Sequence, residues 1–116
     1  MPIVRNAKPV NGSASTPVAA CPVEKAIHVI GGKWKLLVLR SLLLNGPQGY
    51  NQLLASVTGI SAKELTRNLR ELEASCLVTR APGGSVRTSQ YTLTESGKGL
   101  IPAFESLLTW GKSLLS

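Results

Sequence analysis

The segment from Ser61 to Ser75 carries the side chains of this sequence that are best suited to binding a polyanion. At the roughly 3.6 residues per turn of an α-helix, its cationic and hydroxyl side chains fall on one face. This face consists of Lys63, Thr66, Arg67 and Arg70. Lysine and arginine bind phosphates, and arginine and threonine also hydrogen-bond to the edges of bases. The face therefore predicts contacts with nucleic acid, although a solvated surface helix would show the same pattern.

The same segment carries the signals of a helix with one buried side. Ser61 and Glu64 match the S-x-x-E capping box, in which each side chain accepts a hydrogen bond from the other residue's backbone N–H. An apolar stripe at helical spacing lies opposite the cations. Its residues are Leu65, Leu69, Leu72 and Cys76. We expect the stripe to be buried, with the Cys76 thiol inert inside it.

A shorter helix is predicted just before this segment. Asn51 can cap a helix that runs through Val57, and the residues 58–60 form a turn that contains glycine. A short helix, such a turn and a second helix with an outward basic face make the helix–turn–helix pattern. Ser61, at the start of the second helix, joins the predicted DNA-contacting residues. Helical hairpins in proteins that do not bind DNA can imitate this spacing.

After the basic segment the pattern changes from helical to alternating. We expect strands at Leu77–Ala81 and Val86–Leu93, joined by a turn at Pro82–Gly84. A β-hairpin that follows a helix–turn–helix is the wing of a winged helix. Arg80 and Arg87 flank its tip, where we expect a contact with phosphate or the minor groove. The alternative is a purely structural ribbon.

Three further helices are expected around this motif. One begins at Cys21-Pro22, since proline suits the first helical position, and ends at Gly31. A leucine-rich helix follows at Trp34–Leu44, and its apolar residues around most of the circumference place it centrally. A third begins at Thr94-Glu95 and is kinked by Pro102. Its apolar stripe is too broad for one small core, so part of it is assigned to a partner subunit.

The composition favours a polyanionic partner. The 13 lysine and arginine residues against 6 acidic residues give a net charge of +7 and a pI near 9.9. This balance suits DNA, RNA or an acidic membrane surface and does not choose between them. No apolar run approaches the roughly 20 residues that span a bilayer, so we expect no membrane insertion. Two cysteines do not make a disulfide framework, which favours a cytoplasmic protein.

The chain of 116 residues is most simply one folded domain. Residues 1–19 are rich in Pro, Ser, Ala, Asn and Gly and are predicted to be a disordered arm, which leaves 20–116 as the domain. Paired carboxylates, a Ser/His/Asp set and a metal-ligand cluster are all missing from the sequence, which has one histidine. We therefore expect no enzyme, no metal and no cofactor.

Short motifs in chain order resemble the HxlR family of bacterial and archaeal winged helix–turn–helix transcription regulators, which are similar to the MarR group. The motifs are Cys21–Glu24, Gly31–Trp34, Gly59–Ser61, Leu69–Glu73, Leu77–Arg80 and Tyr91–Glu95. The resemblance runs from about Cys21 to Gly111. It implies a mainly α-helical fold with a small β-hairpin wing, and a homodimer joined through its first and last helices. Each subunit would place its recognition helix in the major groove of a palindromic operator.

The resemblance also implies which residues form the dimer interface and adds one residue to the predicted DNA contacts. The implied dimer interface comprises Val23, Ile27, Leu100, Phe104, Leu107, Leu108, Trp110 and Leu114. Trp110 could equally belong to the core. In the wing, family members carry an arginine where this chain has Thr88, so Thr88 is included among the predicted DNA contacts.

Cys21 has two interpretations. In some relatives the cysteine before the first helix senses oxidants, quinones or aldehydes, and a thiol at a helix N-terminus, one turn from Lys25, has raised reactivity. Otherwise Cys21 is a packing residue of the family without a sensing role. The first interpretation adds an oxidant or a small-molecule effector to the expected partners.

Two functions follow from this sequence. The first is a sequence-specific transcriptional regulator that binds double-stranded DNA as a homodimer. The second is a winged-helix module whose basic face binds an acidic protein without specific DNA readout. Preference for one duplex over random DNA would separate the two. The operator, the regulated genes, the effector and the direction of regulation are not encoded in any pattern of the sequence.

Overall fold

The computed structural model describes residues 21–82 and 84–115, and the predicted arm at 1–19 lies outside them. The first helix, α1, spans Pro22–Ile30, with Cys21 as its N-cap and Pro22 at the first helical position. Both features were predicted. None of the residues of α1 is buried, and the side chains of Val23 and Ile27 are 67% and 61% exposed. Taken by itself, α1 is a short amphipathic helix with an uncovered apolar side.

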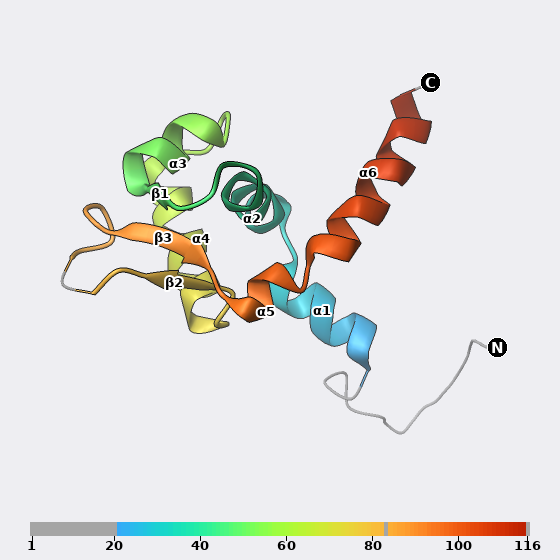
Figure 1. Ribbon diagram of the computed structural model, residues 1–116, viewed down its shortest axis with the longest axis horizontal. Coiled ribbons are helices and arrows are strands. Elements are labelled where there is room, and N and C mark those ends of the chain that lie inside the picture. Colours follow the sequence, from blue (N-terminus) through green and yellow to red (C-terminus); the bar gives the residue numbers. More distant parts are fainter. Residues whose placement is uncertain (1–20, 83, 116) are drawn as a thin grey trace. The chain divides into compact units, whose positions relative to one another are not determined.

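The chain from Gly32 onward forms a second compact unit, which is mainly helical and has a small antiparallel sheet (Figure 1). Its elements are α2 (Lys33–Asn45), β1 (Gln48–Gly49), α3 (Tyr50–Ser56), α4 (Ala62–Ala74), β2 (Val78–Arg80), β3 (Gln90–Leu93), α5 (Glu95–Lys98) and α6 (Ile101–Leu115). The strand order is β1-β3-β2. This arrangement confirms the predicted winged helix–turn–helix fold. Among the described helices, none is both long enough and apolar enough to cross a bilayer.

The core of this unit lies where α2 and α4 meet each other and the sheet. α2 contacts α3, α4 and β3, which confirms its predicted central position. Its Val38 and Leu39 are fully buried, as are Leu65 and Leu72 on the stripe of α4. Full burial of such side chains stabilises a fold by about 1.5–3 kcal/mol each, so the stripe fixes which face of α4 points outward.

The first strand of the sheet and the start of α3 differ from expectation. Gln48 and Gly49, which lie between two predicted helices, pair with Tyr91 and Gln90 of β3. α3 then begins at Tyr50, and Gly49 takes the N-cap position that we had assigned to Asn51. The Gln52 side chain accepts the Gly49 N–H at 2.7 Å, so a glutamine supplies the cap instead of the asparagine.

The wing is shorter than predicted. β2 pairs with β3 from Val78↔Leu93 to Arg80↔Tyr91, but residues 86–88 form a turn and Ser89 lies outside the strand, so the second strand is not extended. Local hydroxyl groups explain the difference. Thr88 Oγ1 accepts the Ser85 N–H at 2.9 Å, and Ser89 Oγ donates to the Ser85 carbonyl at 2.6 Å. Such bonds offer the backbone an alternative to a β-ladder.

The prediction that Cys76 is buried and continues the stripe of α4 was wrong. α4 ends at Ala74, and Cys76 adopts a left-handed conformation with φ of 61° and is exposed. The backbone reversal directs Leu77 inward instead, with 7% of its surface exposed. The periodicity was correct up to Leu72, but the helix ends two residues before Cys76, so the thiol does not join the stripe.

The predicted C-terminal helix is two helices. Thr94 caps the short helix α5, as expected, by accepting the Gly97 N–H at 3.0 Å. The helix then breaks at 99–100, and α6 begins at Ile101 with Pro102 in its first turn. Proline has no N–H to continue the ladder, so it ends one helix and starts another instead of only kinking it.

Candidate nucleic-acid interface

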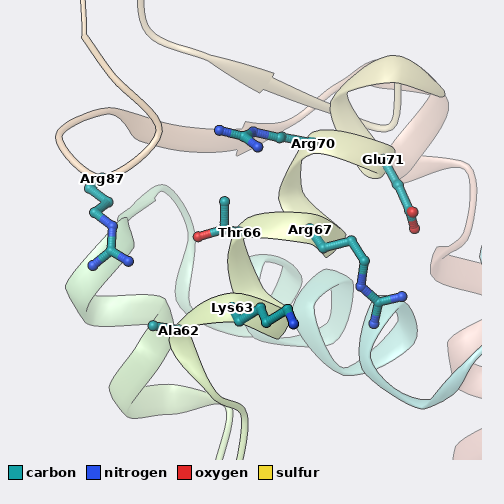
Figure 2. A pocket seen from close by; sticks show the side chains of 7 residues that line it. All are labelled: Ala62, Lys63, Thr66, Arg67, Arg70, Glu71 and Arg87. Carbon is teal, nitrogen blue, oxygen red and sulfur yellow. The ribbon is translucent and has the colours of Figure 1, made fainter.

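The outward face of α4 forms the floor of an open basin of about 750 Å³ (Figure 2). The residues that line the basin are Ala62, Lys63, Thr66, Arg67, Arg70, Glu71 and Arg87. Figure 2 shows Lys63, Arg67 and Arg70 fanning out from one helix, while Arg87 approaches from the wing turn. The structure thus brings together five predicted DNA-contacting residues, including one from a distant part of the sequence. We call this surface the basic basin.

Positive charge dominates the basic basin. Lys63, Arg67, Arg70 and Arg87 form no salt bridge within the described part of the chain. The carboxylate in the lining, Glu71, is paired with Lys35 of α2, whose Nζ lies 3.1 Å from Glu71 Oε1. Because Lys35 neutralises the Glu71 carboxylate, the four cationic side chains of the basin remain available to an external anion.

Arg87 is held toward α4 by an aromatic ring. Its guanidinium carbon lies 5.3 Å from the centroid of the Tyr50 ring, a cation–π distance. The turn that carries Arg87 is fixed from below by the Tyr91 hydroxyl, which donates to the Val86 carbonyl at 2.8 Å. Burial raises the pKa of the Tyr91 phenol above its usual value of 10.0, so the phenol stays protonated, and able to donate, to a higher pH than a free tyrosine.

The predicted capping box at the start of α4 is confirmed. Ser61 Oγ accepts the Glu64 N–H at 3.1 Å, and Glu64 Oε1 accepts the Ser61 N–H at 3.1 Å. The second carboxylate oxygen of Glu64 accepts the indole N–H of Trp34, from α2, at 3.0 Å. The Trp34 ring also passes 3.7 Å from where a Cβ on Gly59 would lie, and Gly59 has a φ of +90° that favours glycine. Trp34 therefore supports both the turn and the first residues of α4.

These contacts lower the pKa of Glu64 below its usual value of 4.5, chiefly because the Ser61 backbone N–H donates to the carboxylate. The ionised Glu64 carboxylate therefore contributes its full stabilisation when the pH is above the pKa that Glu64 has in the unfolded chain. This contribution is lost as the pH falls through the lower pKa that Glu64 has in the folded chain. For Glu64→Gln we expect a flatter decline of stability below pH 4.5 than for the unmodified chain. Urea unfolding at a series of pH values measures this, and parallel curves for the two proteins would contradict it.

The other predicted contacts lie differently. Arg80 donates to the Gly84 carbonyl at 2.7 Å, and its Nε lies 3.5 Å from Glu73 Oε2, so its guanidinium is engaged by the wing and by the end of α4. Thr88 Oγ1 is engaged with Ser85. Ser61 uses its hydroxyl in the cap. None of these three lines the basic basin.

Two residues that position the basin were not predicted from the sequence, Tyr50 and Glu71. Tyr50 sits 2% exposed under Arg87 and Thr66, and Glu71 fixes Lys35. The sequence holds one indirect signal for Tyr50. A tyrosine placed at the start of a helix needs a polar partner for its hydroxyl if its ring is buried. In the described residues, His, Cys, Asp and Glu form no group of three that could hold a metal ion.

Comparisons with known proteins agree with this geometry. Residues 29–116 match the family model described as HxlR-like helix–turn–helix. An uncharacterized HTH-type transcriptional regulator of Methanothermobacter thermautotrophicus is 43% identical over 93 residues, which cover 79% of this chain and 70% of that protein. The HTH-type regulator YkvN of Bacillus subtilis is also 43% identical over 93 residues, covering 79% and 78%.

Among solved structures, two redox-related regulators are similar. The reduced form of the transcriptional regulator YodB from B. subtilis matches with a TM-score of 0.66 and 32% identity, covering 78% of this chain and 89% of that one. The redox regulator HypR in its reduced form matches with a TM-score of 0.70 and 36% identity, covering 80% and 92%. The chain therefore belongs to the HxlR-like helix–turn–helix family and is a transcriptional regulator of the helix–turn–helix type.

Proposed function

We propose that this regulator binds one double-stranded DNA sequence, as a homodimer on a palindromic operator, with α4 in the major groove. The observation that carries the proposal is the basic basin, in which four cations that form no salt bridge among the described residues surround the outward face of α4. The major groove of B-DNA admits an α-helix, and arginine on such a helix hydrogen-bonds to guanine. Arg87, beside the helix, suits a flanking phosphate.

The proposal is tested by fluorescence anisotropy at physiological salt. The full chain is titrated onto its own upstream intergenic DNA and onto a scrambled duplex of the same length. Specific regulators typically bind their site at least about a thousandfold more tightly than random DNA, and we expect this preference here. If the chain instead binds both duplexes equally, weakly and in a salt-sensitive way, and does so for any other duplex selected from a random-sequence pool, the result would favour a module whose basic face binds an acidic protein.

The homodimer is supported by the uncovered apolar side of α6. No residue of α6 is buried, and Leu108, Trp110 and Leu114 are 61%, 62% and 64% exposed. Trp110 is therefore not a core residue of the described chain. α6 and α2 also line an apolar groove of about 460 Å³. Its apolar residues are Leu43, Leu44, Ile101, Phe104, Leu107 and Leu108. A continuous exposed apolar surface of this kind marks a protein–protein contact, and a second copy of α6 is the proposed occupant.

For Leu108→Glu we expect a monomer, because a carboxylate placed in the apolar contact would have to lose its hydration when the two copies associate. The loss of the second half-site should also weaken operator binding. Sedimentation velocity measures the first effect and anisotropy the second. Thr109→Glu is the control, since Thr109 is exposed on the polar face of α6, roughly 100° around the helix from both Leu108 and Trp110, and the variant adds the same charge. A Leu108→Glu protein that remains dimeric would contradict the proposed interface.

Redox control is proposed through Cys21. This thiol lies at the N-cap of α1, is partly exposed, and has no side-chain capping bond. YodB has been solved in quinone-bound and diamide-treated forms, and both forms match this chain. We expect Cys21→Ser to bind the operator as tightly as the unmodified chain but to lose any response to diamide. Cys76→Ser is the control because Cys76 is the other free thiol. If operator binding by the Cys21→Ser protein still responded to diamide, Cys21 would not be the sensing residue.

A further inference from the structure

Tyr50 determines how Thr66 can hydrogen-bond to anything in the basic basin. The Tyr50 hydroxyl lies 2.8 Å from the Ala62 carbonyl and 3.0 Å from Thr66 Oγ1. A carbonyl can only accept, so the single phenolic proton goes to Ala62. The bond to Thr66 must then be donated by the threonine hydroxyl. Thr66 has used its one proton internally, and its oxygen offers only lone pairs outward.

The surroundings keep this arrangement in place. Tyr50 is 2% exposed, so its hydroxyl has little access to water as a competing partner. Arg87 covers the ring, and Arg87 and Thr66 both line the basin. In Figure 2 the Thr66 oxygen lies on the side of α4 that faces Arg87, and the methyl group points another way.

We propose that Tyr50 is a positioning residue that makes Thr66 an obligate hydrogen-bond acceptor, so that Thr66 selects an exocyclic amino group in the major groove. The inference rests on the DNA-binding function proposed above. A free threonine hydroxyl donates or accepts and therefore discriminates poorly between bases. With the proton committed, Thr66 favours adenine N6 or cytosine N4, and it disfavours guanine O6 or thymine O4, which are acceptors themselves.

The test begins with a duplex enriched from a random-sequence pool by the full-length chain. Each adenine of one half-site is replaced by purine and each cytosine by 2-pyrimidinone, which removes the exocyclic amino group alone. At one position we expect affinity to fall roughly 2- to 10-fold, the range of a single hydrogen bond. Thr66→Val should abolish that sensitivity, because valine keeps the shape without the hydroxyl, and Thr66→Ser should retain it.

Tyr50→Phe then tests the polarity. It removes the hydroxyl but keeps the ring under Arg87, and Thr66 becomes free to donate. A transition at the sensitive position, A to G or C to T, puts a carbonyl in place of the amino group. We expect the unmodified chain to discriminate against the transition and Tyr50→Phe to discriminate several-fold less. Tyr91→Phe is the matched control, because it removes another buried phenol that bonds to the wing turn and not to Thr66.

The outcomes separate the two proposals. If no duplex is enriched, specific DNA binding and this inference both fail. If a duplex is enriched but Thr66→Val keeps its sensitivity to loss of the amino group, only the role of Thr66 is overturned. If Thr66→Val loses the sensitivity while Tyr50→Phe discriminates like the unmodified chain, the positioning role of Tyr50 is overturned. Thermal unfolding of each variant by circular dichroism shows that the compared proteins are folded.

Discussion

Replacing Arg67 and Arg70 together by alanine is expected to weaken binding to the specific duplex by on the order of 2–6 kcal/mol, because each such arginine contributes about 1–3 kcal/mol. Both side chains are exposed and make no salt bridge within the described residues, so their removal leaves no buried group without a partner. The fold should be unaffected. Anisotropy titrations at several salt concentrations measure the loss, and the salt dependence should become shallower by about one phosphate contact for each arginine that binds phosphate.

The control for this variant is Lys98→Ala with Lys112→Ala, which removes two positive charges that do not line the basic basin. If the loss came from net charge alone, the control would weaken binding equally. If the double variant folds and binds the duplex with unchanged affinity, neither Arg67 nor Arg70 contacts the DNA. The wing turn would then be left as the site of contact.

Gly97→Ala is expected to destabilise the fold by on the order of 1–3 kcal/mol, the usual range for an overpacked site. A Cβ at position 97 would clash with the Leu77 carbonyl oxygen and would lie 3.2 Å from Leu93 Cδ2, and a backbone atom cannot move aside as a side chain does. The Leu77 carbonyl also accepts the Thr94 N–H at 3.0 Å, so a shift would disturb the end of the sheet. Thermal unfolding should show a midpoint lowered by roughly 4–20 °C.

Gly111→Ala provides the comparison, since it makes the same change within a helix where, apart from that helix's own backbone, no atom of the described residues lies within 4 Å of the added Cβ. Alanine has the higher helix propensity, so this variant should be neutral or slightly stabilised. Both variants are measured at one protein concentration. If Gly97→Ala unfolded at the same temperature as Gly111→Ala, the close approach of α5 to Leu77 would not be a constraint on the fold.

Much of the fold was predictable because its determinants are local. The capping box of Ser61 and Glu64, proline at the start of α1 and the apolar stripe of α4 each depend on residues within a few positions of one another. Local signals were less reliable where two of them competed. At 86–89 the strand-like alternation was overridden by hydroxyl groups that bond to the Ser85 backbone. At Cys76 the periodicity continued beyond the point where the helix ended.

The cationic face of α4, and with it the prediction of a nucleic-acid partner, follows from the sequence alone, because helical spacing fixes which side chains share a face. The tertiary structure decided what surrounds that face. It placed Arg87 over Tyr50, paired Glu71 with Lys35, and engaged Arg80 within the wing. It also joined Tyr50 to Thr66 and Trp34 to Glu64 across many intervening residues. Such pairs are created when the buried stripes of separate elements pack together, and no spacing within one element specifies them.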